Sequence, residues 1–169
     1  MAKYQSPIGD TPDEHMRLVG IIALHWEWVE IVLERVLADV MEQDFSSIAL
    51  LTNNVSFRDK CDLILTYARV FEEPEPETWK RFTKSITRLK DAYSGRNQFI
   101  HAQWRRDKTT KEWGRSVVRT RGGKLTLLEE TVLIGDMEKV AQEIWDAAEE
   151  FTQLCQARGV LLFPWNDKS

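Results

Sequence analysis

Residues 77–104 read ETWKRFTKSITRLKDAYSGRNQFIHAQW, and this stretch decides the fold. Its apolar residues recur every three or four positions, which is the spacing of one buried face on an amphipathic helix. We expect this helix to begin at Glu77 or Thr78, after the EEPEP run at 72–76, and to continue to Trp104. The expected inward face consists of Trp79, Phe82, Ile86, Leu89, Tyr93, Asn97, Ile100 and Trp104.

Three stretches before it also predict helices. Apolar residues keep a helical period over 12–41 and again over 44–51. A third helix is expected over 56–71, because Ser56 and Asp59 have the spacing of a capping box at a helix start.

The pattern changes after the fourth helix. Residues 113–121 and 124–131 are rich in Val, Thr and Leu, and Gly122-Gly123 between them is typical of a two-residue turn. These residues predict a β-hairpin. Asp136 is then expected to cap a last long helix that stops at Gly159.

The predicted fold is therefore mainly α: an antiparallel bundle of four long helices plus a short one, with the β-hairpin inserted before the last long helix. We expect a single domain over 1–169, with flexible ends at 1–10 and 166–169. The composition, 43% hydrophobic and 30% charged, is typical of a soluble globular protein. Without a membrane-length apolar run or a secretory signal, we expect a cytoplasmic protein that does not enter a membrane.

The charge of the chain is unevenly distributed. The overall net charge is −4, yet residues 79–124 hold 14 Lys and Arg against three Asp and Glu, a local net charge of +11. A basic middle segment indicates a surface that meets an anion, although a solvated positive helix face explains the same charge pattern.

The sharpest motif is Arg96-Asn97 followed by His101. On a helix, Asn97 and His101 lie one turn apart on a shared face, with Arg96 on the neighbouring flank. A guanidinium binds phosphate as a bidentate donor, and an imidazole exchanges protons near neutral pH. This combination suits RNA cleavage by attack of the 2′-OH on the adjacent phosphate, with His101 as general acid or base and Asn97 orienting the ring or the substrate.

These three residues resemble the motif of the HEPN (higher eukaryotes and prokaryotes nucleotide-binding) domain superfamily. Its hallmark is an Arg, usually followed by Asn, and a His after four to six intervening residues, near the C-terminal part of a bundle helix. The resemblance implies a metal-independent endoribonuclease, commonly a toxin or host-defence effector, that needs no cofactor and acts as a homodimer with the motif at the interface. It also implies an antitoxin or nucleotidyltransferase protein as a possible partner. Catalytically inactive members that bind RNA or serve as scaffolds are also common in the family.

The motif supplies one histidine per protomer, which supports the same expectation of a dimer. Acid and base roles in such a cleavage often need two groups, and a two-fold dimer would supply both. Arg105, Arg106 and Lys108 extend the positive charge beyond the motif and are expected to follow the RNA backbone, and Trp104 is a candidate for stacking on a base. His25, on the inward face of the first helix, is a candidate to line the same cleft.

Other titratable residues have a structural interpretation. His15 is expected to be exposed and inert, and Glu27, Glu30 and Glu34 are expected to be solvated or to pair with the basic segment. The three histidines lack ligand spacing, so we expect no metal site. Cys61 and Cys155 lie on apolar helix faces and are expected to be buried, reduced thiols.

Two alternatives to the enzyme remain open. In the first, the same face binds nucleic acid, nucleotide or a protein partner without catalysis. In the second, the motif is structural: Asn97 and His101 form hydrogen bonds across the bundle or dimer, and Arg96 pairs with an acid of the first helix.

Overall fold

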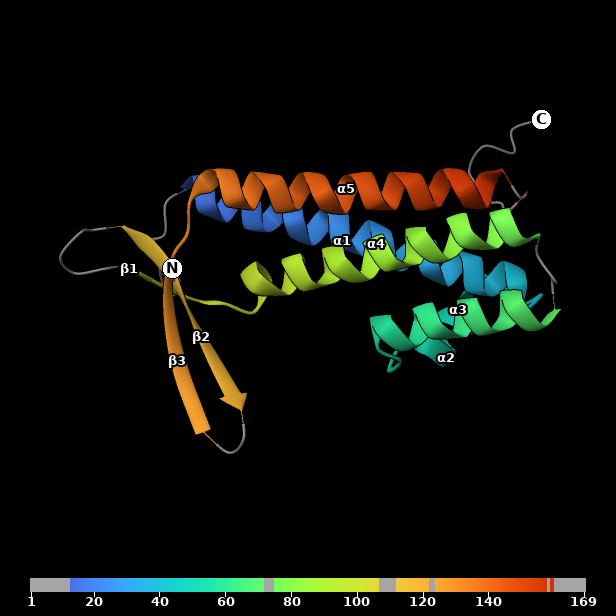
Figure 1. The fold of residues 1–169 in the computed structure, drawn as a ribbon, viewed down its shortest axis with the longest axis horizontal. Helices are drawn as coiled ribbons and strands as arrows, with labels where there is room; N and C mark the ends of the chain where they lie inside the picture. The colour runs from blue at the N-terminus through green and yellow to red at the C-terminus, as the bar shows by residue number, and fades with distance from the viewer. Residues whose placement is uncertain (1–12, 72–74, 107–111, 122–123, 158, 160–169) are drawn as a thin grey trace, which may run out of the picture.

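A computed structural model describes residues 13–71, 75–106, 112–121, 124–157 and 159. The expected mainly α fold is confirmed, with a small antiparallel sheet between the last two helices (Figure 1). The elements are α1 (Asp13–Val40), α2 (Phe45–Thr52), α3 (Phe57–Phe71), α4 (Pro76–Ile100), β1 (Gln103–Arg106), β2 (Trp113–Arg121), β3 (Lys124–Thr131) and α5 (Ile134–Gln156).

The long helices α1, α4 and α5 lie side by side, with the sheet at one end and α2 and α3 at the other (Figure 1). The bundle is not antiparallel throughout: α4 runs against the other long helices, whereas α1, α3 and α5 share one direction. The reason is that the short α2 carries the chain back before α3 begins. None of the described helices has the length and apolarity needed to cross a membrane.

The core forms where the predicted apolar faces meet. Leu89 of α4 and Ile144 of α5 are fully buried, and α4 approaches α5 closely at Gly95, where an added Cβ would lie 3.3 Å from Val140 Cγ1. Cys61 and Cys155 are buried as expected, and burial raises the pKa of the Cys61 thiol to about 12, which keeps it protonated. Burial of a large apolar side chain such as Leu89 or Ile144 contributes roughly 1.5–3 kcal/mol to folding.

Two helix starts agree with the sequence. The Asp44 carboxylate accepts a hydrogen bond from the Ser47 backbone N–H, which caps α2. The Ser56 hydroxyl accepts one from the Asp59 N–H, so Ser56 caps α3 at the predicted place. The Asp59 carboxylate accepts from the Ser56 hydroxyl, and not from the backbone N–H as in a full capping box.

The boundaries of α4 and α5 differ from the prediction. Helix α4 begins at Pro76 rather than at residue 77 or 78, because proline is well suited to the first helical position. It ends at Ile100 rather than at Trp104, because the chain turns into strand β1. Asp136 does not cap α5, which begins at Ile134 after an extended Leu133; the aspartate lies in the first turn, where its charge favours the helix dipole.

The sheet contains the predicted hairpin and one strand that the sequence pattern did not indicate. Strands β2 and β3 pair so that Arg121 lies opposite Lys124 and Arg115 opposite Glu130. Strand β1 joins the free edge of β2, with Trp104 opposite Arg115. Its first two residues, Gln103 and Trp104, were expected to end the fourth helix, because so short a strand has no alternating pattern of its own.

A buried ion cluster joins α1 to α3. Lys60 is only 5% exposed, and its Nζ donates to Glu34 at 2.7 Å and to Glu30 at 3.0 Å. Burial lowers the pKa of Lys60, but hydrogen bonds to the two glutamates outweigh it, so the net shift is upward. Glu30 and Glu34 were expected to be solvated or to pair with the basic segment, but they pair with Lys60 of α3. Glu27 is exposed, as expected.

Replacing Gly20 or Gly114 by alanine is expected to change the free energy of unfolding in opposite directions. Gly20→Ala is expected to raise the free energy of unfolding by about 1 kcal/mol, because Gly20 is inside α1 and an added Cβ meets nothing within 4 Å. Gly114→Ala is expected to lower it by about 1–3 kcal/mol, because its Cβ would lie 2.8 Å from the Glu130 carbonyl oxygen. Urea unfolding of both variants measures these changes. Equal stability of the two variants would contradict the close contact between β2 and β3.

Lys60→Met is expected to destabilise the protein by about 2–3 kcal/mol, because it leaves two partly buried carboxylates without their counter-ion. The control is Lys139→Met, which removes an exposed pair with Glu143 and should change stability by less than about 0.5 kcal/mol. In the parent, the contribution of Lys60 should persist at neutral pH and be lost as the pH rises through its raised pKa. Similar losses in the two variants would refute the buried cluster.

Candidate active site at the end of helix α4

The motif residues meet where α4 ends. Arg96 and Asn97 lie in the last turns of the helix, and His101 is the first residue beyond it, with φ −100° and ψ 8°. His101 is exposed, whereas Arg96 and Asn97 are half-buried. The sequence pattern placed His101 inside the helix. In the structure its imidazole instead projects from the helix end.

A single nitrogen of Arg96 contacts both of its motif partners. Arg96 Nη1 donates to Asn97 Oδ1 at 2.8 Å and lies 2.8 Å from His101 Nε2. Because a guanidinium only donates, Nε2 must be the acceptor, and a neutral His101 then carries its proton on Nδ1. Asn97 thus orients the guanidinium. Of the two roles expected for it, this contact replaces orientation of the imidazole and leaves a hydrogen bond to the substrate as a prediction.

The guanidinium of Arg96 also faces an aromatic ring of the first helix. Its central carbon lies 5.9 Å from the centre of the Trp26 ring, a cation–π distance. The Trp26 indole N–H donates to Glu30, which accepts from Lys60 through its other oxygen. Among the described residues, no carboxylate lies within ion-pair distance of Arg96. The expected alternative, a pair with an acid of α1, is thus replaced by a contact with Trp26.

Arg115 of β2 fixes the end of α4 to the sheet. Its guanidinium donates to the Gln98 carbonyl oxygen at 2.9 Å, and it pairs with Glu130 on the opposite strand at 2.6 Å. It also lies 5.2 Å from the centre of the Phe99 ring. Sequence reasoning counted Arg115 only as a basic residue. The register of β2 and β3 places it opposite Glu130, and the predicted turn residues 122–123 lie outside the described part of the chain.

The four residues expected to extend the RNA-binding surface do not all lie where the sequence pattern placed them. Trp104 is half-buried in β1, where its ring stacks on Phe99 at 6.4 Å, so its stacking capacity is used inside the protein. Arg105 and Arg106 lie in the same strand, and Lys108 lies outside the described residues.

The other two histidines are separate from the motif. His15 is 8% exposed and lies edge-on to Trp104 at 5.8 Å, so the expectation of an exposed residue was wrong. The reason is that β1, absent from the predicted fold, covers the first turn of α1. His25 faces α5, where its Nδ1 lies 3.1 Å from the Ala141 carbonyl oxygen. Neighbouring helix residues point roughly 100° apart, so His25 and Trp26 face different helices and His25 does not join the motif.

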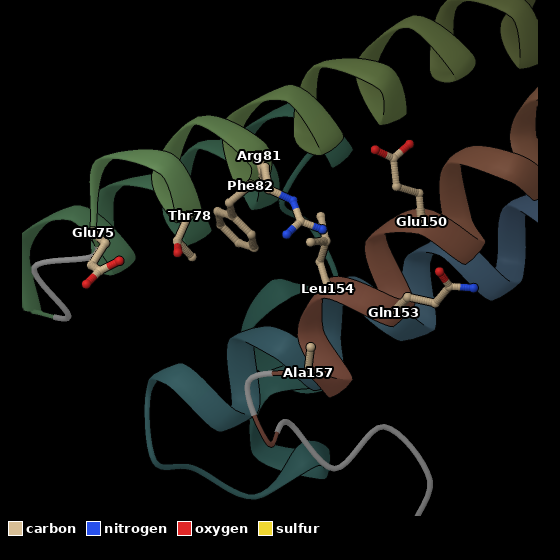
Figure 2. A pocket seen from close by; sticks show the side chains of 8 residues that line it. All are labelled: Glu75, Thr78, Arg81, Phe82, Glu150, Gln153, Leu154 and Ala157. Atoms are coloured by element: carbon tan, nitrogen blue, oxygen red, sulfur yellow. The ribbon is translucent and has the colours of Figure 1, made fainter.

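A hollow lies at the opposite end of α4. It has a volume of about 490 Å³ and is lined by Thr78 and Arg81 of α4 and by Gln153 and Leu154 of α5 (Figure 2). Thr78 and His101 are separated by about 35 Å along the helix axis. This hollow is therefore not part of the candidate site.

Arg115→Ala is expected to lower the free energy of unfolding by about 1–2 kcal/mol, because it removes the hydrogen bond to the Gln98 carbonyl oxygen and the pair with Glu130. Amide hydrogen exchange should accelerate most in the last turn of α4. The matched control is Arg17→Ala, which breaks an exposed pair with Glu14 and should change stability by less than about 0.5 kcal/mol. Unchanged exchange at the end of α4 would show that Arg115 does not hold it.

Comparisons with known proteins give no relative from which a role could be transferred: no family model, curated protein or solved structure matches this chain. Among the described residues, no group of three or more His, Cys, Asp or Glu side chains is placed to hold a metal ion. The candidate site is therefore defined by its own geometry.

Proposed function

We propose that this protein is a HEPN-like, metal-independent endoribonuclease that uses Arg96 and His101 in catalysis. The observation that carries the proposal is the meeting of a guanidinium, an amide and an exposed imidazole around Arg96 Nη1. Cleavage of RNA through its own 2′-OH needs a proton carrier and a fixed cation at the phosphate. These two side chains provide both, and we place the protein in a toxin or host-defence role.

Substrate binding would rearrange the contacts of Arg96. A phosphate oxygen is a stronger acceptor for a guanidinium than a neutral imidazole nitrogen, because the hydrogen bond is charge-assisted on both sides. The phosphate would therefore take Nη1 from His101, while Asn97 Oδ1 keeps the guanidinium in place. This exchange frees Nε2 next to the bound phosphate.

The freed nitrogen then serves as the base. His101 Nε2 accepts the proton of the 2′-OH as the 2′-oxygen bonds to phosphorus, and the bond from phosphorus to the 5′-oxygen breaks. Negative charge on the phosphoryl oxygens is stabilised by Arg96. The leaving 5′-oxygen needs a proton, so the products are a 2′,3′-cyclic phosphate and a 5′-hydroxyl.

A second copy of the chain is the best source of that last proton. Within one protomer, His15 is buried and His25 faces α5, so neither lies beside His101 at the surface. An isologous dimer that places two α4 ends together would bring two imidazoles and two guanidiniums to one phosphate. We therefore propose a homodimer with a shared site. An antitoxin or nucleotidyltransferase partner remains part of the same proposal.

One observation favours a second function. In the structure, His101 Nε2 is engaged by Arg96, which suits a site that binds an anion without moving a proton. A catalytically silent module that binds RNA through the same residues is therefore the alternative.

The test is incubation of the purified protein in EDTA with single-stranded RNA of mixed sequence. We expect fragments with cyclic phosphate ends. His101→Ala should lower kcat/KM by about 10²–10⁴-fold, because it removes the base. Arg96→Lys should lower it by about 10²–10³-fold, because an ammonium cannot bind the phosphate in a bidentate way.

The control is His25→Asn, which should leave cleavage unchanged, since His25 lies on the α5 side. Melting temperatures should stay close to that of the parent for His101→Ala, whose side chain is exposed. RNA binding without cleavage by the parent would favour the silent module, and cleavage that survives His101→Ala would rule out the proposed chemistry.

A further inference from the structure

A small hollow lies where the end of α4, the hairpin and the start of α5 come together (Figure 1). It has a volume of about 270 Å³, just below the roughly 300–1,000 Å³ of pockets for drug-sized ligands. Gln98 of α4 lines it, and His101 follows Gln98 by three residues, which is about one helical turn. This hollow is therefore next to the candidate active site, unlike the one at the start of α4.

The charges around the hollow disfavour a second phosphate there. Three carboxylates line it, those of Glu130, Asp136 and Glu143, together with the cations of Arg115 and Lys139. Both cations already have a carboxylate partner, since Arg115 pairs with Glu130 and Lys139 with Glu143. The part of an RNA that suits these surroundings is a neutral base.

Arg115 holds two hydrogen-bonding side chains of the hollow next to each other. Its Nη2 donates to Gln98 Oε1 at 3.1 Å and to Glu130 Oε2 at 2.6 Å, and the arginine side chain is only 12% exposed. Because a guanidinium only donates, the oxygen of the Gln98 amide must face it, which turns the amide N–H groups elsewhere. Among the described residues, these N–H groups have no acceptor and Glu130 Oε1 has no donor. A donor and a charged acceptor are therefore adjacent and available.

The position of the motif fixes which of the two groups is nearer the sugar of a bound nucleotide. Gln98 lies one turn before His101, whereas Glu130 lies on β3, which is separated by β2 from the strand that follows His101. A nucleotide whose phosphate is held by Arg96 would thus enter with its sugar on the Gln98 side. The tip of its base, farthest from the sugar, would meet the Glu130 carboxylate.

A carboxylate at the tip of the base discriminates among the four bases of RNA. Adenine and cytosine carry an amino group there, beside a bare ring nitrogen, so Glu130 accepts from the amino group and Gln98 donates to the ring nitrogen. Guanine and uracil carry a carbonyl oxygen there, beside a ring N–H. With these two bases, acceptor would face acceptor and donor would face donor, which leaves both protein groups unpaired.

We infer that this hollow is a base-binding site that selects adenine or cytosine in a nucleotide next to the scissile phosphate. The inference rests on the proposed ribonuclease function and names the substrate preference of that same site. Glu130 and Gln98 bind the base, and neither takes part in proton transfer.

The test measures kcat/KM for short single-stranded RNAs that carry each of the four bases at the two nucleotides flanking the cleaved bond. At one of these nucleotides, adenine and cytosine should be preferred over guanine and uracil by about 10–100-fold. Where adenine is preferred, purine without its amino group should lose most of that advantage. Hypoxanthine, which has a carbonyl in place of the amino group, should be cleaved as poorly as guanine.

Glu130→Gln should reduce the preference to less than about threefold, because an amide can turn to donate to a carbonyl oxygen. The ratio between bases is measured within one protein, so any loss of folded protein through the broken pair with Arg115 cancels. The matched control is Glu149→Gln, an exposed residue of α5 that does not line the hollow and should leave the preference unchanged.

The outcomes separate this inference from the proposed function. Cleavage by the parent at equal rates for the four bases, or a preference that survives Glu130→Gln, would overturn the inference and leave the ribonuclease intact. RNA binding without cleavage, but with the same base preference and its loss in Glu130→Gln, would support the inference and overturn catalysis. A parent that neither binds nor cleaves RNA would overturn both.

Discussion

The contacts of the buried Trp26 ring are the constraint on which the rest of this structure depends. Trp26 belongs to α1, yet it packs edge-on against Phe57 of α3 at 4.6 Å and against Tyr93 of α4 at 5.3 Å. Its indole N–H is fixed by Glu30, which in turn binds the buried Lys60. Three helices thus meet around one side chain, and the guanidinium of Arg96 lies over the same ring. The position of the candidate site is therefore set by the core.

The second determinant is the way in which α4 ends. A helix that stops leaves its last carbonyl groups without partners, and here Arg115 of β2 satisfies the one of Gln98. Because Arg115 is itself held by Glu130 across the hairpin, the sheet fixes the last turn of α4. The chain then turns into β1 directly after His101, which leaves the imidazole exposed beside Arg96. The small sheet therefore has a positioning role as well as a place in the fold.

The charge that an external anion meets depends on which cations are paired with carboxylates as well as on how many cations there are. The basic segment over 79–124 carries a net charge of +11, and three of its described cations pair with carboxylates: Arg88 with Glu150, Lys90 with Asp62 and Arg115 with Glu130. Arg96 of this segment has no carboxylate of the described residues at ion-pair distance and instead faces the Trp26 ring. An anionic ligand is attracted by the cations left unpaired, because paired charges largely cancel at distances beyond a few ångströms.

The sequence by itself determined the elements whose signals are local. Helical periodicity located the helices, the Ser56 and Asp59 pair marked the start of α3, and the stretches rich in Val, Thr and Leu located the hairpin strands. Arg96, Asn97 and His101 are also close together in the structure, but through the contacts of Arg96 with its neighbour Asn97 and with the C-cap residue His101, and not through the predicted pairing of Asn97 with His101 one turn apart.

Only the tertiary structure decided what surrounds those residues. Strand β1 is too short to have a pattern, so the end of α4, the burial of His15 and the packing of Trp104 followed from its pairing with β2. The contact of Arg96 with Trp26 joins residues 70 positions apart, and the separation of His25 from the motif depends on the direction in which α1 faces α5. Contacts between distant segments depend on how whole faces pack, which local spacing does not encode.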